Sequence, residues 1–309
     1  ALFRHAWAAR ATYGTESERV NASGFYLYDR FRTTLLASGQ DTTDVYTDGL
    51  LRTRRVNIQA SLPLRRTVRS IQTASVTWRR EREEVLGSDD PEDRVDLGGL
   101  ETAWAISSAR SYPWSISPTE GARLRLAWLH EAKALGSDLS LDKLTADARA
   151  YRRVFGERDV LALRAGGGTT YGEEQFDRSF AVGGFPDANL FDIVRTNNAV
   201  LRGYPDNAFT GRRYAAFNAE YRFPLFSPQR GWRSFPLFLR HFRGSVFFDA
   251  AHAWSDAFRA DDLKTSAGAS IGLESAIGFA LPLSAEVTVA RGFQEQGETK
   301  VYFRFGLAF

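Results

Sequence analysis

The sequence predicts an all-β protein whose strands form one transmembrane antiparallel β-barrel. The composition favours strands and turns over helices, because the 309 residues include 23 Phe, 11 Tyr, 7 Trp and 26 Gly. Many segments alternate apolar and polar residues with a period of two, the pattern of a strand with two different faces. The sequence has no run of about 18 apolar residues, which excludes spanning helices, whereas a barrel carries its lipid-facing residues at alternate positions.

Thirteen segments show this alternation and are predicted to be strands. In chain order they are residues 3–13, 24–34, 51–62, 67–80, 99–108, 122–130, 141–151, 160–168, 212–225, 245–254, 267–274, 283–291 and 300–309. The first four are expected to form two hairpins, with Pro63 in the tight turn of the second. Segment 141–151 also suits a helix, because Ala and Leu are strong helix formers, but its alternation favours a strand.

Three segments between the strands are predicted to be loops. Residues 38–48 are rich in Asp, Thr and Gly, and residues 81–96 mix acidic and basic side chains at high density. The acidic run at 89–93 lacks the spacing, the central Gly and the terminal Glu of an EF-hand, so we expect a solvated loop there. Residues 169–211 form the longest irregular segment, and such a stretch inside one domain usually has a function.

Basic residues are spread along the predicted strands instead of being gathered in one patch. The chain carries 40 Lys and Arg against 37 Asp and Glu, a net charge of +3. Several arginines occupy alternate strand positions that are expected to face inward, namely Arg123, Arg125, Arg164, Arg222 and Arg304. This scatter is typical of a polar lumen and argues against nucleic-acid binding.

The sequence lacks the usual patterns of catalysis and metal binding. His5, His130, His241 and His252 have no partner at the spacing of metal ligands, and no Gly-x-Ser-x-Gly motif occurs. The glycines at 166–168 are not followed by the Lys and Ser/Thr of a phosphate-binding loop. The chain has no Cys, so it sets no condition on the redox compartment. We therefore expect no enzyme, no cofactor and no metal site.

The strongest candidate site combines two predicted strands with the loop before them. Within 212–225 and 245–254, the alternation places Glu220 and Asp249 on polar strand faces. If both faces border one enclosed space, the two carboxylates can receive a cation. Arg202 is the candidate, because carboxylates hold a planar guanidinium bidentately. A plain salt bridge that only fixes the loop is an equal alternative.

Three short motifs follow one another around these residues. Residues 201–204 are Leu-Arg-Gly-Tyr, residues 218–225 are Asn-Ala-Glu-Tyr-Arg-Phe-Pro-Leu, and residues 247–251 are Phe-Phe-Asp-Ala-Ala. They resemble the V-R-G-F/Y loop, the E-Y-R-F-P-L strand and the F-x-D-x-G strand of the bacterial surface antigen superfamily of outer-membrane barrels. That superfamily includes the BamA-type assembly factors and the two-partner-secretion transporters. The motifs cover about the C-terminal third, and Ala251 stands where the family has Gly.

The resemblance implies a role for each residue of the loop motif. A long extracellular loop that carries Arg202, Gly203 and Tyr204 folds back into the lumen of the barrel. Arg202 then pairs with Asp249, near Glu220. In this arrangement the loop braces the lumen, and a lysine at position 202 would not replace the arginine fully.

The same resemblance implies a strand number and a domain organisation. A complete family barrel has sixteen strands, so either strands are undercounted here or the chain begins some three strands into the barrel. Counting back from the extracellular loop, residues 3–13 run towards the periplasm. The chain has no Met and no leader, as expected for a processed chain or a fragment. Residues 1–309 are expected to form one barrel domain, with the family's periplasmic POTRA domains upstream or replaced by another module or subunit.

The last predicted strand ends in the pattern of an assembly signal. Its outward positions are Val301, Phe303, Phe305, Leu307 and Phe309. A C-terminal strand that ends in Phe resembles the signal read by the outer-membrane assembly machinery, carried here by Phe305, Leu307 and Phe309. The final aromatic ring would lie at the lipid interface.

These features imply an integral protein of the bacterial outer membrane. The leading hypothesis is a barrel that inserts or translocates polypeptides through a weak seam between its first and last strands. Its partners would be outer-membrane lipid and lipopolysaccharide, client polypeptides, and periplasmic or lipoprotein subunits. One alternative is a passive pore for small polar or anionic solutes. Another is a surface or structural barrel whose loops at 38–48 and 81–96 bind partners.

Overall fold

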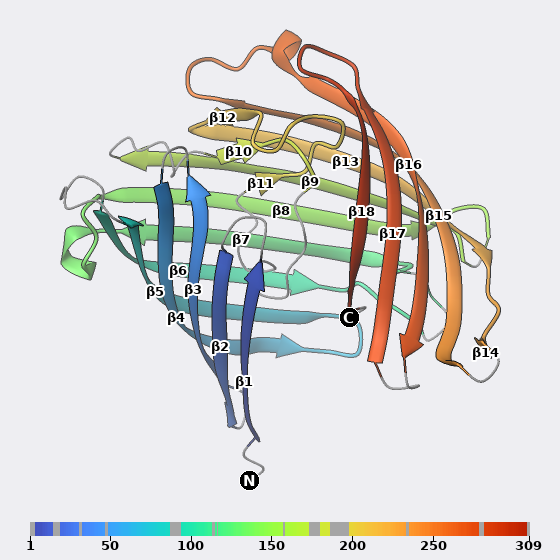
Figure 1. Ribbon diagram of the computed structural model, residues 1–309, viewed down its shortest axis with the longest axis horizontal. Helices are drawn as coiled ribbons and strands as arrows, with labels where there is room; N and C mark the ends of the chain where they lie inside the picture. Colours follow the sequence, from blue (N-terminus) through green and yellow to red (C-terminus); the bar gives the residue numbers. More distant parts are fainter. Residues whose placement is uncertain are drawn as a thin grey trace. The chain divides into compact units, whose positions relative to one another are not determined.

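The computed structural model describes residues 4–14, 19–30, 33–46, 49–86, 94–112, 115, 117–156, 158–172, 180–185, 198–232, 235–277 and 281–307. Strands make up most of them (Figure 1). The strands are β1 (Arg4–Gly14), β2 (Arg19–Arg30), β3 (Thr33–Tyr46), β4 (Gly49–Arg66), β5 (Ile71–Leu86), β6 (Arg94–Ser107), β7 (Gly121–Glu131), β8 (Leu141–Arg153), β9 (Val160–Gly172), β10 (Phe180–Val182), β11 (Asn198–Ala199), β12 (Phe209–Gly211), β13 (Arg213–Phe226), β14 (Arg230–Trp232), β15 (Phe235–Trp254), β16 (Lys264–Ile277), β17 (Leu281–Gly292) and β18 (Thr299–Leu307). Two 3₁₀ helices, η2 (Lys133–Leu135) and η5 (Ala260–Asp262), lie between strands. No helix in the described ranges is long and apolar enough to cross a membrane.

Among the described residues, fourteen strands are neighbours in chain order within one sheet: β1 to β9, then β13, then β15 to β18. The short strand β14 pairs with β15 beside this path. All the predicted strands belong to this order, and the strand that the prediction lacks is β3. The direction expected for residues 3–13 was counted back through thirteen strands, so the additional strand removes the basis of that prediction.

Residues 38–48 were expected to form an exposed loop, and that prediction is wrong for residues 38–46. They lie in β3, where Ser38 pairs with residues of both β2 and β4. The polar side chains serve the strand: Arg52 of β4 donates from Nε and Nη2 to the carboxylate of Asp41 at 2.9 and 2.6 Å. A polar composition also suits a strand when its charged side chains pair with those of the neighbouring strand, as Asp41 does with Arg52.

Pro63 was expected in a tight turn, and this prediction is wrong as well. It lies inside β4, beside a shift of register between Pro63 and Arg65. A proline has no N–H to donate, and a β-bulge is one of the few places in a sheet where this is tolerated. The hairpin turn lies further on, where the N–H of Thr67 donates to the carbonyl oxygen of Ser70 at 2.8 Å.

The predicted loop at 81–96 is largely strand. Its first residues close β5 and its last residues open β6, while residues 87–93 lie outside the described ranges. The charged side chains suggested a solvated loop, but they form an ion pair between these two strands. Arg82 Nε and Nη2 donate to the Asp96 carboxylate at 2.6 and 3.1 Å. The two segments proposed as partner-binding loops are therefore mainly parts of the sheet.

The first compact unit comprises Ala1–Ile106, Arg125–Thr145 and Thr170–Glu174. Its strands β1 to β5 pair antiparallel in chain order. A buried ion pair joins β4 to β5, because Arg55 stands opposite Glu81 and donates from Nε to its carboxylate at 2.9 Å. The two residues are only 4% and 2% exposed, so one face of this unit carries buried charge.

The second compact unit comprises Ser107–Leu124, Ala146–Thr169 and Gln175–Phe309. In it β13 pairs with β9 on one side and with β15 on the other, and β15 to β18 pair antiparallel in order (Figure 1). The long irregular segment that was predicted between β9 and β13 contains a small sheet in the order β11-β10-β12. This small sheet contacts β13 and β15 (Figure 1).

The small sheet packs against one face of β13 and β15 through an apolar core. The buried members of this core are Phe180, Val182, Leu201, Tyr204, Tyr214, Ala216, Ala251 and Ala253. Small residues at Ala216, Ala251 and Ala253 leave room for the backbone of this segment, while its Phe180 ring packs at a tilt against Tyr214 with ring centroids 4.6 Å apart.

The opposite face of β15 to β18 is apolar and exposed. Alternate residues on these strands carry large exposed hydrophobic side chains, namely Val246, Phe248, Ile271, Val287, Val289, Val301 and Phe303. An apolar surface spread over neighbouring strands at a period of two is the pattern of a sheet that faces lipid. It agrees with the outward positions predicted for Val301 and Phe303.

Candidate functional site

The site is built on the buried face of β13 and β15. Their register places Asn218 opposite Asp249 and Glu220 opposite Phe247. Because side chains alternate along a strand, these four residues lie on the same face. Asp249 is fully buried at 0% exposure, and a buried carboxylate requires compensating charge and hydrogen bonds.

The compensating charge comes from the irregular segment between β11 and β12. Arg202 donates from Nε to Asp249 Oδ2 and from Nη2 to Oδ1, both at 2.7 Å. The Arg202 guanidinium carbon also lies 3.3 Å from the centroid of the Phe247 ring, so the cation is stacked on an aromatic face. A bidentate salt bridge combined with stacking on an aromatic ring suits the planar guanidinium group of arginine and not the ammonium group of lysine.

Asn218 completes this arrangement. Its Nδ2 donates to Asp249 Oδ1 at 2.9 Å and lies 3.2 Å from the carbonyl oxygen of Val200. One side chain thus bonds the acid and the backbone that leads to Arg202. We call the four residues Arg202, Asp249, Asn218 and Phe247 the clamp. Asn218 and Phe247 were not among the predicted site residues, although both alternate with Glu220 or Asp249 on the polar faces of their strands.

Glu220 has a different partner from the one expected. Its carboxylate lies 3.1 Å from Nε of Arg222, two residues along the same strand. No hydrogen bond between Glu220 and Arg202 is found in the described residues, and the register explains this, because Asn218 and not Glu220 faces Asp249. The structure therefore brings Arg202 to one of the two predicted carboxylates, with Glu220 on the same strand face beside it.

Gly203 allows the segment to approach the strands closely. Its φ angle is +82°, a conformation that glycine adopts without strain. A Cβ atom there would lie 2.5 Å from the backbone nitrogen of Gly292, at the end of β17. Two hydrogen bonds fix this approach: the Gly203 N–H donates to the hydroxyl of Tyr302 at 2.9 Å, and the Glu298 N–H donates to the Gly203 carbonyl at 2.9 Å.

Tyr204 anchors the segment on the other side of Gly203. It is fully buried, and its hydroxyl lies 2.9 Å from the carbonyl oxygen of Thr265 and 2.8 Å from Oε1 of Gln294. It also accepts the backbone N–H of Gln294 at 3.2 Å. The three consecutive residues of the motif thus bond to β15, β16, β18 and the β17–β18 connection. Ala251, which replaces the glycine of the family motif, lies buried in the core below them.

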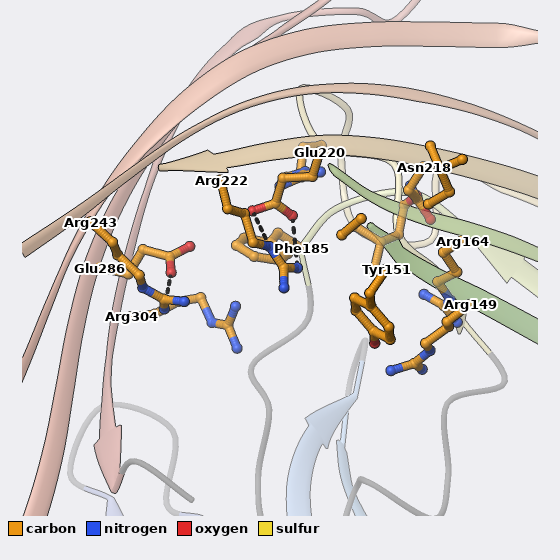
Figure 2. A pocket seen from close by; sticks show the side chains of 14 residues that line it. Arg149, Tyr151, Arg164, Phe185, Asn218, Glu220, Arg222, Arg243, Glu286 and Arg304 are labelled. Carbon is orange, nitrogen blue, oxygen red and sulfur yellow. Dashed lines mark hydrogen bonds and ion pairs between the residues drawn. The ribbon is translucent and has the colours of Figure 1, made fainter. Parts of the chain in front are cut away.

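A cavity of about 270 Å³ lies beside the clamp (Figure 2). Arg202, Asn218 and Glu220 line it, together with further arginines from neighbouring strands. Figure 2 shows Glu220 next to Arg222 at one wall of this space. The side chains that predominate are guanidinium groups, which bind anions and neither attack nor transfer protons at neutral pH.

The remaining predicted site residues lie at the end of the chain. Phe305 and Leu307 belong to β18, where they pair with Ala285 and Leu283 of β17. Phe309 lies outside the described residues. Their role as an assembly signal stays a prediction.

His252 and His241 contact neighbouring side chains of the protein. His252 stacks on Trp254 with ring centroids 5.7 Å apart, and His241 Nδ1 lies 3.1 Å from Ser227 Oγ. No group of three or more metal-ligating side chains occurs within the described part of the chain.

Comparison with known proteins places the chain in a family. The Omp85 superfamily domain matches residues 7–309. BamA from Haemophilus ducreyi lacking POTRA domains 1–3 has a similar structure, with a TM-score of 0.59 at 12% identity over 98% of this chain and 69% of that chain. CdiB from Acinetobacter baumannii gives a TM-score of 0.60 at 10% identity over 94% of this chain and 50% of that chain. No curated protein sequence matches the chain.

At these identities the two structures establish a shared fold. The family match covers almost the whole chain and confirms the superfamily indicated by the three sequence motifs. Barrels of this family are not enzymes, as expected from the sequence. The chain belongs to the Omp85 superfamily and is an integral β-barrel protein of the bacterial outer membrane.

Proposed function

We propose that this barrel inserts or translocates polypeptides at the outer membrane, with residues 1–309 as its barrel domain. Its family and its likeness in fold to BamA and CdiB support the proposal. The observation that carries it is the clamp, in which buried Arg202 and Asp249 hold the long segment between β9 and β13 against the sheet. A segment fixed by a buried ion pair is a structural brace, because opening it would expose an uncompensated charge.

The brace acts next to a strand edge that can receive a client. Among the described strands of the second unit, β18 pairs with β17 alone, so one row of its backbone N–H and C=O groups has no partner strand within that unit. Gly306 lies in β18, and a glycine weakens a strand. Tyr302 of β18 bonds to Gly203, so the clamped segment also steadies this edge strand. Client strands would add to the edge by β-augmentation.

The test is a client-insertion assay with the protein in liposomes. An unfolded barrel client is added, and the fraction that becomes resistant to protease is measured. The wild-type protein should raise this fraction, and Asp249→Ala should reduce it. The matched control is Asp41→Asn, which removes a carboxylate from a half-exposed pair in the first unit and should leave insertion unchanged. Equal insertion with wild-type and with protein-free liposomes would refute the proposal.

A passive pore for small anions is the second candidate. The arginines that line the cavity beside the clamp favour it, because fixed positive charge raises the local concentration of anions. Single-channel recording in planar bilayers separates the two functions. A long-lived open state selective for anions would support the pore, whereas a closed or briefly opening barrel with client insertion would support the insertase.

A further inference from the structure

We propose that the cavity beside the clamp binds a doubly charged oxyanion of the phosphate class. The cavity measures about 270 Å³. Its lining arginines are Arg149, Arg164, Arg202, Arg222, Arg243 and Arg304. They belong to β8, β9, β13, β15, β18 and the clamped segment, and Figure 2 shows the labelled ones projecting from different sides of the space. The donors therefore surround a volume instead of lying in one plane.

Two of these arginines are each neutralised by one carboxylate of the lining. Arg222 lies 3.1 Å from Glu220, and Arg243 donates from Nη2 to Glu286 at 2.8 Å. The Nε of Arg243 is nevertheless buried and makes no hydrogen bond to any described residue. Because this nitrogen is enclosed by protein atoms, it is not counted among the donors to the cavity, and the positive charge for an anion has to come from the other arginines.

The other arginines leave positive charge in excess. Arg149 and Arg164 share a single carboxylate, because both donate to Asp147, at 2.7 and 2.6 Å. Arg304 has no carboxylate partner in the described ranges, and its guanidinium carbon lies 4.5 Å from the centroid of the Phe185 ring. With Asp249 bound to Arg202, four carboxylates face six arginines, which leaves two uncompensated positive charges.

Charge, shape and size together select the ligand. Two excess charges match a dianion. Guanidinium groups bind phosphate in a two-pronged manner, and donors from several sides suit the tetrahedral oxygens of phosphate better than a flat carboxylate. The volume lies just below the roughly 300–1,000 Å³ of pockets for drug-sized molecules, so the ligand is a small group. Free phosphate and the phosphate of a soluble headgroup share this chemistry.

Calorimetric titration of the folded protein in detergent tests the proposal. Inorganic phosphate is the first probe, titrated at constant ionic strength, and glycerol phosphate is the second. We expect saturable binding of one phosphate per chain. Arg304→Gln should raise the Kd about tenfold or more, because it removes a charged donor without an internal partner. The control Arg259→Gln makes the same charge change at an exposed position outside the cavity and should leave the Kd unchanged.

Each outcome decides the matter. Tighter binding of glycerol phosphate than of phosphate would identify a headgroup, the reverse would identify the free ion, and both retain the site. Absence of saturable binding, an unchanged Kd in Arg304→Gln, or equal binding of succinate would overturn it. Folding of Arg304→Gln is checked by electrophoresis of unheated samples, in which a folded barrel migrates as a compact form. If this variant does not fold, Arg149→Gln replaces it, since Arg149 shares the Asp147 carboxylate with Arg164. The proposal is independent of the insertase function, because binding is measured without a client.

Discussion

The two compact units bury their charges in different ways. In the first unit, Arg55 and Glu81 stand opposite each other on the adjacent strands β4 and β5, so the pair forms as soon as these strands align. In the second unit, Arg202 comes from a segment outside the main sheet order and reaches Asp249, 47 residues further along the chain. The first kind of pair belongs to strand pairing. The second requires an additional packing event, so the segment can be released while the strands stay paired.

The largest expected effect distinguishes these two kinds of pair. Asp249→Ala leaves the Arg202 guanidinium buried without its acid, and Glu81→Ala does the same to Arg55, so each should lower the free energy of unfolding by about 3–5 kcal/mol. Only Asp249→Ala should release the segment 198–211 for cleavage by protease before global unfolding. Urea unfolding followed by Trp fluorescence and limited proteolysis measure the two effects.

Arg202→Lys sharpens the same comparison. It keeps the charge but loses the two-pronged bond and the flat contact with Phe247, so its effect should fall between wild type and Arg202→Ala. Equal protease resistance of the segment in wild type and Asp249→Ala would show that the apolar core, and not the ion pair, holds it in place.

The second effect concerns how closely the segment approaches the strands. Gly203→Ala adds a Cβ 2.5 Å from the backbone nitrogen of Gly292 at a φ angle of +82°, and should cost about 1–3 kcal/mol. The control is Gly39→Ala in β3, where the nearest atom to an added Cβ is 4.0 Å away. Urea unfolding of both variants gives the difference. A loss no larger than that of Gly39→Ala would mean that the segment shifts at little cost.

The strands of both units were predicted well from the sequence, because apolar and polar residues alternate along the strands of both units. The prediction failed at β3, whose Ser, Thr and Asp residues are typical of a loop when taken alone. The decisive fact was the charge on the neighbouring strand, since Asp41 is bonded by Arg52 of β4. A single sequence read segment by segment does not contain that pairing.

Only part of the candidate site was predictable, because its contacts also depend on how neighbouring strands pair. The motif identified Arg202 and Asp249, and the structure places them in contact. Their neighbours depend on the register between β13 and β15, which sets Asn218 and not Glu220 opposite Asp249. Alternation excludes a slip of one residue, which would turn every side chain to the other face, but a slip of two residues keeps the faces and is not excluded by it. Phe247 carried a signal, because it alternates with Asp249, but aromatic residues are common on both faces of these strands.

The third effect tests the bond between the clamped segment and the last strand. Tyr302→Phe removes the hydroxyl that accepts the Gly203 N–H at 2.9 Å, and should cost about 1 kcal/mol. Tyr221→Phe is the control, since the Tyr221 hydroxyl bonds to Asp159 at 3.2 Å, away from the clamp. Hydrogen exchange of the Gly203 amide should be faster only in Tyr302→Phe. Unchanged exchange would show that the apolar packing alone protects this amide.

The smallest effect separates the buried and the half-exposed pairs within the first unit. Arg52 and Asp41 are 32% and 36% exposed as side chains, so Asp41→Asn should cost only about 0.2–1 kcal/mol. Added salt screens exposed charges, and the difference between wild type and Asp41→Asn in urea unfolding should shrink towards zero at high salt. The cost of Glu81→Ala should persist, because Arg55 and Glu81 are only 4% and 2% exposed. If the costs of Asp41→Asn and Glu81→Ala fell equally with salt, burial would not distinguish these two ion pairs. The difference between ion pairs on adjacent strands and the clamp would then depend only on the packing of the clamped segment.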